Sequence, residues 1–329
     1  WPPGAASKWW LRRSLAALDK RLRELGSRLV IRRGPTLAAL RQLAAETGAT
    51  AVAWNRRYEP AIIARDAEVK IALRAANYEV GSCNAALLHE PWTIQNKSAK
   101  PFQVFTPFWR HCLNQADPQK PLPAPRALRA PKKFPNGLAL DELELEPKID
   151  WHSGLRSAWQ PGESGARERL DEFLNRAFDA YAENRNRPDL AGTSKLSPHL
   201  HFGEISPRQI WHALLALAEK RGIPTLLWRN SQFLTELGWR EFAHHLLYHF
   251  PKTAGEPLRP EFKNFPWRVN RRSLRKWQQG ETGFPIVDAG MRELWATGWM
   301  HNRVRMIVAS FLVKDLLQTW KTGRSEEHT

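Results

Sequence analysis

A proline-rich stretch divides this sequence of 329 residues into two parts with different patterns. Each proline removes a backbone donor and restricts the residue before it, so closely spaced prolines prevent a long helix. The prolines that break this stretch are Pro118, Pro121, Pro123, Pro125, Pro131, Pro135 and Pro147. We therefore expect residues 91–165 to form a linker between two domains and no domain of their own.

The part before the linker alternates helical and strand-like patterns. Apolar residues at helical spacing predict helices over residues 14–25, 36–47 and 66–76. Short apolar runs predict strands over residues 28–31 and 50–54. Strands that alternate with helices favour a parallel sheet with helices on both faces. We expect a partial α/β, Rossmann-like domain over residues 1–90, whose first strands are missing because the sequence begins in mid-chain without an initiator Met.

The part after the linker is helical and rich in tryptophan. Helices are expected over residues 166–184, 206–221, 228–249, 270–279, 285–297 and 301–320. These elements predict an all-helical domain over residues 166–323. Residues 324–329 resemble a translated sequencing adapter, and we expect them to be a non-native tail.

The charge of the chain favours a polyanionic partner. The sequence contains 50 Lys and Arg against 33 Asp and Glu, a formal net charge of +17. Nucleic acid is preferred to a membrane, because no apolar run approaches the length of a bilayer span. A merely basic soluble protein would have the same composition. The sequence has only Cys83 and Cys112 and no visible signal peptide, which favours a cytoplasmic location.

The segment from Trp299 to Met306 combines side chains that neither a surface helix nor a core helix requires. On a helix, Asn302, Arg305 and Met306 lie on neighbouring faces, because residues three and four apart are adjacent. A surface helix does not need Trp299 or Met306, and a core helix must find partners for Asn302, Arg303 and Arg305. The simpler interpretation is a partly exposed amphipathic helix.

Ordered motifs extend along the whole chain. They are Trp9-Trp10-Leu11, Trp54-Asn55, Tyr58-Glu59-Pro60, Val104-Phe105-Thr106-Pro107-Phe108, Thr193-Ser194-Lys195-Leu196-Ser197-Pro198, the segments 236–242 and 265–267, the segment 283–306, and Trp320. Together they resemble the DNA photolyase/cryptochrome family, closest to the class I cyclobutane pyrimidine dimer photolyases (deoxyribodipyrimidine photo-lyases). The resemblance implies a chain truncated at both ends, without the segment that closes over the flavin.

The resemblance implies that the helical domain binds FAD. In the 193–198 loop, three hydroxyls, a cation and the start of a helix capped by Ser197 suit an anion such as a pyrophosphate. Taken alone, such a segment is more often an ordinary loop and helix cap. The residues expected to bind FAD are Tyr181, Thr193, Ser194, Leu196, Ser197, Phe233, Arg240, Asn302 and Arg305.

The resemblance also implies light-driven repair of cyclobutane pyrimidine dimers. Photolyases are a standard example of enzymes that extrude their target base. Trp239 would stack on the extruded dimer, Glu236 would hydrogen-bond to it, and Asn302 and Met306 would complete the pocket. The spacing of Glu236 and Arg240 is also typical of a surface ion pair. Asn302 and Met306 favour repair over a cryptochrome photoreceptor, which is the alternative, and a basic nucleic-acid-binding module without flavin is a third possibility.

Two further groups of residues have expected roles. By resemblance, Trp267 and Trp320 belong to a tryptophan chain that reduces the flavin, and the inner member would lie beyond Gly323. Arg185 and Arg303, with Trp239, are expected to contact UV-damaged DNA. A basic run nearby favours a surface that follows phosphates: Arg268, Arg271, Arg272, Arg275 and Lys276.

Other cofactors are less constrained. His245 and His249 stand one helical turn apart beside His244, but no third ligand follows at a usual spacing, so no metal is expected. The antenna chromophore stays open among deazaflavin, flavin and folate types, because Ala61 and Ile62 depart from the folate-binding pattern. The protein is expected to act as a monomer.

Overall fold

The computed structural model describes residues 3–146 and 149–325. The chain divides into two compact units, which are described separately here. The first comprises Trp1–Leu15, Glu144–Ser194 and Arg259–Thr329, and the second comprises Ala16–Leu143 and Lys195–Leu258. The expected tail, residues 324–329, lies largely outside the described residues. The domain boundaries expected at residues 90 and 165 stay a prediction, because packing units and sequence domains are different divisions of a chain.

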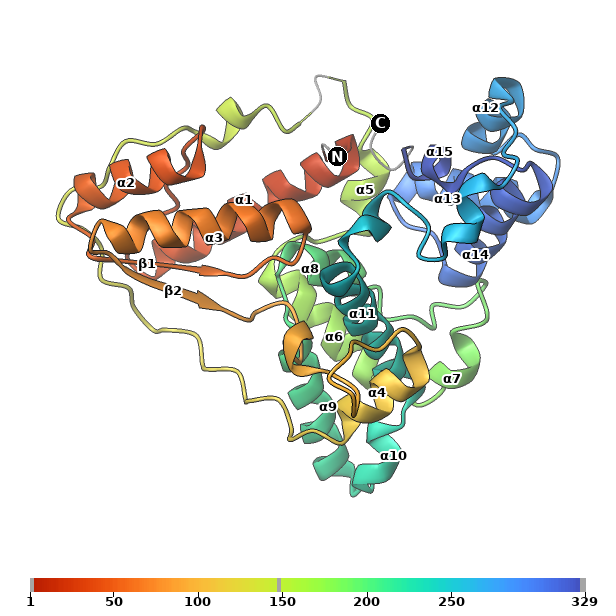
Figure 1. Cartoon of the computed structure of the whole chain (residues 1–329), viewed down its shortest axis with the longest axis horizontal. Coiled ribbons are helices and arrows are strands. Elements are labelled where there is room, and N and C mark those ends of the chain that lie inside the picture. The colour runs from red at the N-terminus through yellow and green to blue at the C-terminus, as the bar shows by residue number, and fades with distance from the viewer. Residues whose placement is uncertain (1–2, 147–148, 326–329) are drawn as a thin grey trace. The chain divides into compact units, whose positions relative to one another are not determined.

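The α/β part contains a small parallel sheet. β1 (Ala51–Asn55) pairs with β2 (Glu79–Cys83) in a register that runs from Ala51 opposite Glu79 to Asn55 opposite Cys83. The helix α3 (Pro60–Ala75) connects the two strands and lies along them, with α2 (Thr36–Thr47) beside it (Figure 1). This is the strand, helix, strand arrangement that a parallel pair requires. The expected α/β class is confirmed.

Some of the element boundaries predicted for the α/β part agree with the structure, and others do not. The helix over residues 36–47 is confirmed, and Gly48 ends it in the left-handed conformation, with φ 67°. The helix predicted from residue 66 begins at Pro60, because proline suits a first helical turn. The helix predicted from residue 14 begins at Ala5, in α1 (Ala5–Glu24). The predicted strand over residues 28–31 was wrong: the segment has no strand pairing, although Ile31 O accepts a backbone hydrogen bond from Leu138 N.

The proline-rich stretch has little regular structure. It contains one nine-residue helix, α4 (Phe105–Leu113), the short helix α5 (Ser153–Ala158), and the 3₁₀ turns η1 (Pro91–Thr93) and η2 (Leu140–Leu143). Residues 114–139 contain neither helix nor strand. The absence of a long helix there agrees with the spacing of the prolines.

Helices dominate the remainder of the chain. They are α6 (Glu163–Arg176), α7 (Tyr181–Asn184), α8 (Ser197–Phe202), α9 (Pro207–Arg221), α10 (Thr225–Arg229), α11 (Gln232–His249), α12 (Arg271–Gln279), α13 (Pro285–Thr297), α14 (Asn302–Ser310) and α15 (Trp320–Ser325), with 3₁₀ turns η3 (Pro251–Ala254) and η4 (Pro260–Asn264) and a π-helical turn η5 (Phe311–Asp315). The expected all-helical part is confirmed.

Three predicted helices are interrupted. The helix expected over 166–184 is divided into α6 and α7, and that over 228–249 into α10 and α11, where Ser231 begins α11 by accepting a hydrogen bond from Leu234 N. The helix expected over 301–320 leaves the α-helical path after Ser310, and Leu317 takes a left-handed φ of 52°. Local capping and backbone geometry override helical periodicity at these points.

The core of the first unit lies among α12, α13 and α14. Its buried members are Trp277, Val287, Met291, Met300, Val304, Val308 and Leu312. Gly290 permits the close packing of α13 against α14, because a Cβ there would overlap the Cγ1 atom of Val304. The indole N–H of Trp277 donates to the carbonyl of Val308 at 3.1 Å, which anchors α12 to α14.

Candidate functional site

An aromatic stack lies where α11 meets α4 in the second unit. The ring of Trp239 is parallel to that of Phe105, with centroids 3.7 Å apart and planes 10° apart. Phe105 is in turn nearly parallel to Trp109, with centroids 6.5 Å and planes 12° apart. Trp109 is 6% exposed and Trp239 is 47% exposed. The stack therefore begins in the core and ends in an indole at the surface.

Gly238 allows this stack to form. A Cβ at Gly238 would lie 2.6 Å from Cδ2 of Trp109, so α4 approaches the backbone of α11 only because this position has no side chain. Phe242 packs edge-on against both Phe105 and Trp239, at 5.9 and 6.0 Å. The exposed indole is thus held by the packing of two helices, a property that spacing along the sequence does not reveal.

Glu236 stands one helical turn before Trp239. Its Oε1 accepts a hydrogen bond from Nε2 of Gln232 at 2.8 Å, and its side chain is half-buried. Phe233, expected to touch the flavin, is buried on the same helix. The structure therefore places Glu236 and the exposed Trp239 on one helix, as the motif predicted.

Arg240 and Glu241 hold the loop that precedes η1. Arg240 Nη1 donates to the carbonyl of Ala86 at 2.6 Å, while Glu241 Oε2 accepts from the backbone N–H groups of Leu88 at 2.9 Å and His89 at 3.4 Å. Arg240 Nη1 also lies 3.7 Å from Glu241 Oε1. This arrangement places the Arg240 guanidinium on the loop, and its expected orientation toward a flavin stays a prediction.

Burial governs the protonation of this pair. Desolvation raises the pKa of Glu241 to about 7, although Arg240 and the two backbone N–H groups oppose the shift. Desolvation also lowers the pKa of Arg240. Sequence analysis missed Glu241. Its only signal is a carboxylate directly after an arginine, on the side of the helix that is mainly apolar.

The histidines of α11 bind backbone and aromatic groups. His245 Nε2 accepts from Phe102 N at 3.2 Å, and His249 Nε2 donates to Pro91 O at 3.0 Å. The ring of His244 packs edge-on against Tyr58 at 5.9 Å. Over residues 3–146 and 149–325, no group of three or more His, Cys, Asp or Glu side chains is arranged to hold a metal.

The 193–198 loop differs in one respect from expectation. Ser197 is the first residue of α8, the cap position is Leu196, and no side chain caps the helix. The predicted Ser197 cap was therefore wrong: Lys195 turns the chain with a left-handed φ of 51°, and the helix begins one residue earlier than predicted. Leu196 is buried and Ser197 is exposed.

The hydroxyls of this loop suit an anionic group. Thr193 and Ser194 are half-buried and follow Gly192, where a Cβ would lie 2.6 Å from Cβ of Asn184. This close approach packs the loop against α7, which carries the buried Tyr181. Two hydroxyls on a backbone fixed in this way are a donor set that fits a pyrophosphate.

The helix α14 is amphipathic. Val304 and Val308 are buried, whereas Asn302, Arg305 and Met306 are exposed, Met306 to 55%. The ring of His301 begins the helix, because its Nδ1 accepts from Arg303 N at 3.2 Å. The simpler prediction of a partly exposed amphipathic helix is confirmed, and the three expected site residues lie on its exposed side.

The first unit also brings together the two arginines expected to contact phosphate. Arg303 Nε donates to Oδ1 of Asn186 at 2.8 Å, so α14 is joined to the residue after Arg185. The guanidinium of Arg185 lies 5.9 Å from the ring centre of Tyr181. These contacts connect the expected DNA-binding arginines with an expected flavin-binding residue.

Two hydrogen bonds hold the segments of the two expected electron-transfer tryptophans side by side. The N–H of Arg268 donates to the carbonyl of Leu317 at 2.8 Å, and Gln318 Nε2 donates to the carbonyl of Asn270 at 3.2 Å. Trp267 directly precedes Arg268, and Trp320 lies two residues after Gln318. Both indoles are half-buried.

Comparison with known proteins shows the family. The model "DNA photolyase" matches residues 1–126, and "FAD binding domain of DNA photolyase" matches residues 233–327. A deoxyribodipyrimidine photo-lyase of Agrobacterium fabrum is 46% identical over 98% of this chain and 67% of its own length. Cryptochrome-1 of Arabidopsis thaliana is 39% identical, with 98% of this chain and 48% of that protein covered.

A solved structure agrees with these matches. A bacterial class III photolyase from Agrobacterium tumefaciens has a TM-score of 0.95 and 46% identity, with 99% of this chain and 67% of that chain covered. The chain thus spans about two thirds of the length of the photolyases and about half that of the plant cryptochrome. Within the described residues, no helix is long and apolar enough to cross a membrane. With an FAD-binding domain recognised in its sequence, the chain belongs to the DNA photolyase/cryptochrome family.

Proposed function

We propose that the protein repairs cyclobutane pyrimidine dimers in UV-damaged DNA in a light-driven reaction, as a monomeric deoxyribodipyrimidine photo-lyase in the cytoplasm. The observation that carries this proposal is the exposed Trp239 at the end of the aromatic stack with Phe105 and Trp109. Reduced FAD, when bound, supplies the electron that light transfers to the dimer and that returns after the ring opens.

Trp239 provides a surface for an extruded base. One face of its indole is covered by Phe105, and much of the rest is open to solvent. A base that leaves the double helix loses its stacking partners, and stacking on an aromatic side chain restores about 1–3 kcal/mol per base. Because the packing of α4 and α11 already fixes the indole, little entropy is lost when a base stacks on it.

The other expected site residues offer polar groups. Glu236, one turn from Trp239, presents a carboxyl group whose Oε1 is already oriented by Gln232. Asn302 and Met306 present an amide and a thioether on the exposed side of α14. Thr193 and Ser194 are the hydroxyls that would hold the pyrophosphate of FAD, with Tyr181 close to the same loop. Arg185 and Arg303 would hold the DNA backbone.

A cryptochrome photoreceptor is the second candidate, because relatives with both names match nearly the whole chain. The two differ in their affinity for damaged DNA. A photolyase needs a surface that binds an extruded dimer, and the exposed indole of Trp239 favours that function. The antenna chromophore is left open among deazaflavin, flavin and folate types.

The test compares two exposed tryptophans. Trp239→Ala should weaken binding to dimer-containing duplex by about 1–3 kcal/mol, or about 5- to 150-fold, with a smaller effect on undamaged duplex. Trp295→Ala is the control, because Trp295 is 66% exposed on α13. It should leave both affinities unchanged.

Two results would contradict the proposal. Equal losses of affinity for both duplexes in Trp239→Ala would show that the dimer does not stack on Trp239. Failure of the full-length, FAD-loaded protein to remove dimers in blue light, with the flavin reduced beforehand, would favour the photoreceptor.

A further inference from the structure

The helix α12 is anchored in the core by one side. Leu274 packs against the core of the first unit, and Trp277 is 5% exposed with its N–H bonded to Val308 O. Asn270 caps the helix, because its Oδ1 accepts from Ser273 N at 3.0 Å. The position of α12 in the first unit is therefore fixed by apolar contacts and by its cap.

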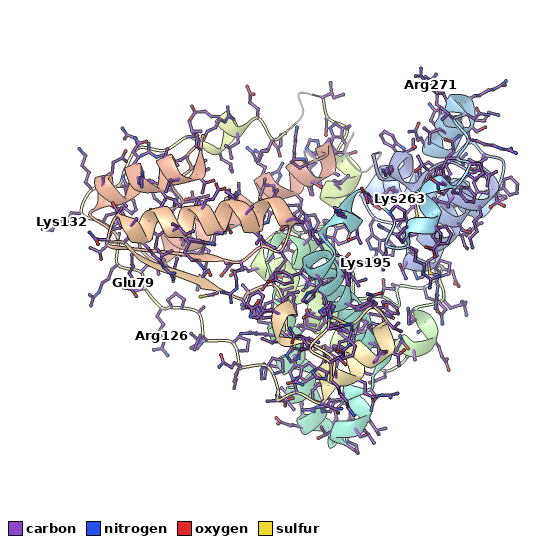
Figure 2. All side chains as sticks on the ribbon, viewed as in Figure 1. Glu79, Arg126, Lys132, Lys195, Lys263 and Arg271 are labelled. Carbon is purple, nitrogen blue, oxygen red and sulfur yellow. The ribbon has the colours of Figure 1, made fainter. Side chains whose placement is uncertain are left out.

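The opposite side of α12 is a continuous basic face. We define the α12 basic face as the exposed side chains Arg271, Arg272, Arg275 and Lys276 of the helix together with Arg268, which precedes it. Figure 2 shows the side chain of Arg271 at the outer end of the helix. Across residues 3–146 and 149–325, no ion pair joins any of these five cations to a carboxylate. Glu281 is the one acidic residue that shares the hollow lined by this face.

This arrangement costs folding free energy. Arg271 with Arg275, and Arg272 with Lys276, are like charges four residues apart, and each such pair destabilises a helix by about 0.2–0.5 kcal/mol. Arg271 and Arg272 also occupy the first turn, where the helix dipole disfavours cations and where α12 has no acidic residue. A bound polyanion would offset this repulsion by adding favourable interactions with the same side chains.

We propose that the α12 basic face binds the phosphodiester backbone of duplex DNA outside the damaged site, independently of damage and sequence. The proposal rests on the DNA-binding function above and adds a second contact to it. Arg side chains bind phosphate through two parallel N–H groups, which suits a strand of phosphates better than a point anion. The nine residues of α12 extend about 13 Å. One strand of duplex DNA carries roughly four phosphates over that length of its helix axis.

The test neutralises the face and measures salt dependence. Arg271→Gln, Arg272→Gln, Arg275→Gln and Lys276→Gln are combined in one variant of the full chain, since glutamine retains helix propensity. The matched control combines Arg126→Gln, Arg129→Gln, Lys132→Gln and Lys133→Gln, which removes the same charge from exposed positions in the irregular segment (Figure 2). Binding to undamaged and dimer-containing duplexes is titrated at several salt concentrations.

The α12 variant should make the negative slope of log K against log salt less steep by up to about 3.6, because each of the four lost phosphate contacts accounts for roughly 0.9. Its affinity should fall by the same factor on both duplexes, so that the preference for damage is unchanged. The control should change the slope much less. A slope equal to that of the control, or a loss confined to damaged DNA, would overturn the proposal.

Two further measurements complete the test: the stability of the α12 variant in urea, and its binding to a second polyanion. Removal of the like-charge pairs should leave the urea midpoint of the α12 variant equal to or above that of the parent, and a lower midpoint would overturn the argument from repulsion. Binding to vesicles of anionic phospholipid that depends on α12, with DNA binding unaffected, would assign the face to a membrane surface and overturn the proposal. Failure of the proposed repair function would show separately, as no preference for damaged DNA.

Discussion

The buried carboxyl of Glu241 should make the stability of the protein depend on pH in a characteristic way. Its pKa is about 7 in the folded chain, against a usual 4.5, because burial penalises the charged form. The folded state therefore holds the proton more tightly than the unfolded state. The resulting stabilisation is fully present below pH 4.5 and is lost as pH rises through 7. A difference of about 2.5 pKa units corresponds to about 3 kcal/mol.

The substitution Glu241→Gln isolates this effect. The amide oxygen can still accept from Leu88 N, but the side chain no longer ionises. The unfolding free energy of the variant minus that of the parent should therefore rise by about 2–3 kcal/mol between pH 5 and pH 8.5. Burial lowers the pKa of His89, His244 and His245 to about 4, which makes both proteins more stable as pH rises toward 6.5. That trend is common to both proteins and cancels in the difference.

The assay is urea unfolding followed by tryptophan fluorescence at several pH values. Glu68→Gln serves as the control, because Glu68 is exposed on α3 and water solvates its carboxylate in both states. A difference curve for Glu241→Gln that is flat with pH, or that matches the control, would refute the conclusion that burial holds this carboxyl protonated near neutrality.

Two other predictions concern packing and electron transfer. Gly290→Ala should lower stability in urea, because overpacking against Val304 costs about 1–3 kcal/mol while the gain in helix propensity is about 1 kcal/mol; unchanged or greater stability would contradict the close packing of α13 on α14. In the full-length, FAD-loaded protein, Trp267→Phe or Trp320→Phe should abolish photoreduction of the flavin and leave repair by chemically reduced protein intact. Lower thermal stability with normal photoreduction in both variants would show that these tryptophans only pack in the core and do not transfer electrons.

Local patterns predicted some elements well and failed at specific points. The helix over 36–47 was predicted to the residue, because its apolar spacing ends at Gly48, which supports the left-handed turn after it. The prediction of a strand over 28–31 failed because a strand needs a hydrogen-bonded neighbouring strand. The β-propensity of the segment alone does not provide that neighbour. β2 was missed, since Glu79–Cys83 is half-exposed and contains Gly81, and only pairing with β1 makes it a strand.

The sequence by itself determined the family, the α/β and helical parts, and the residues of each motif, because these depend on residue types and their order. The tertiary structure decided which of those residues act together. Trp239 becomes a fixed surface only where α4 packs on Gly238, and Glu241 acquires its raised pKa only in a buried position. Stacking and desolvation depend on the distances between segments remote in the chain, and no local pattern contains those distances.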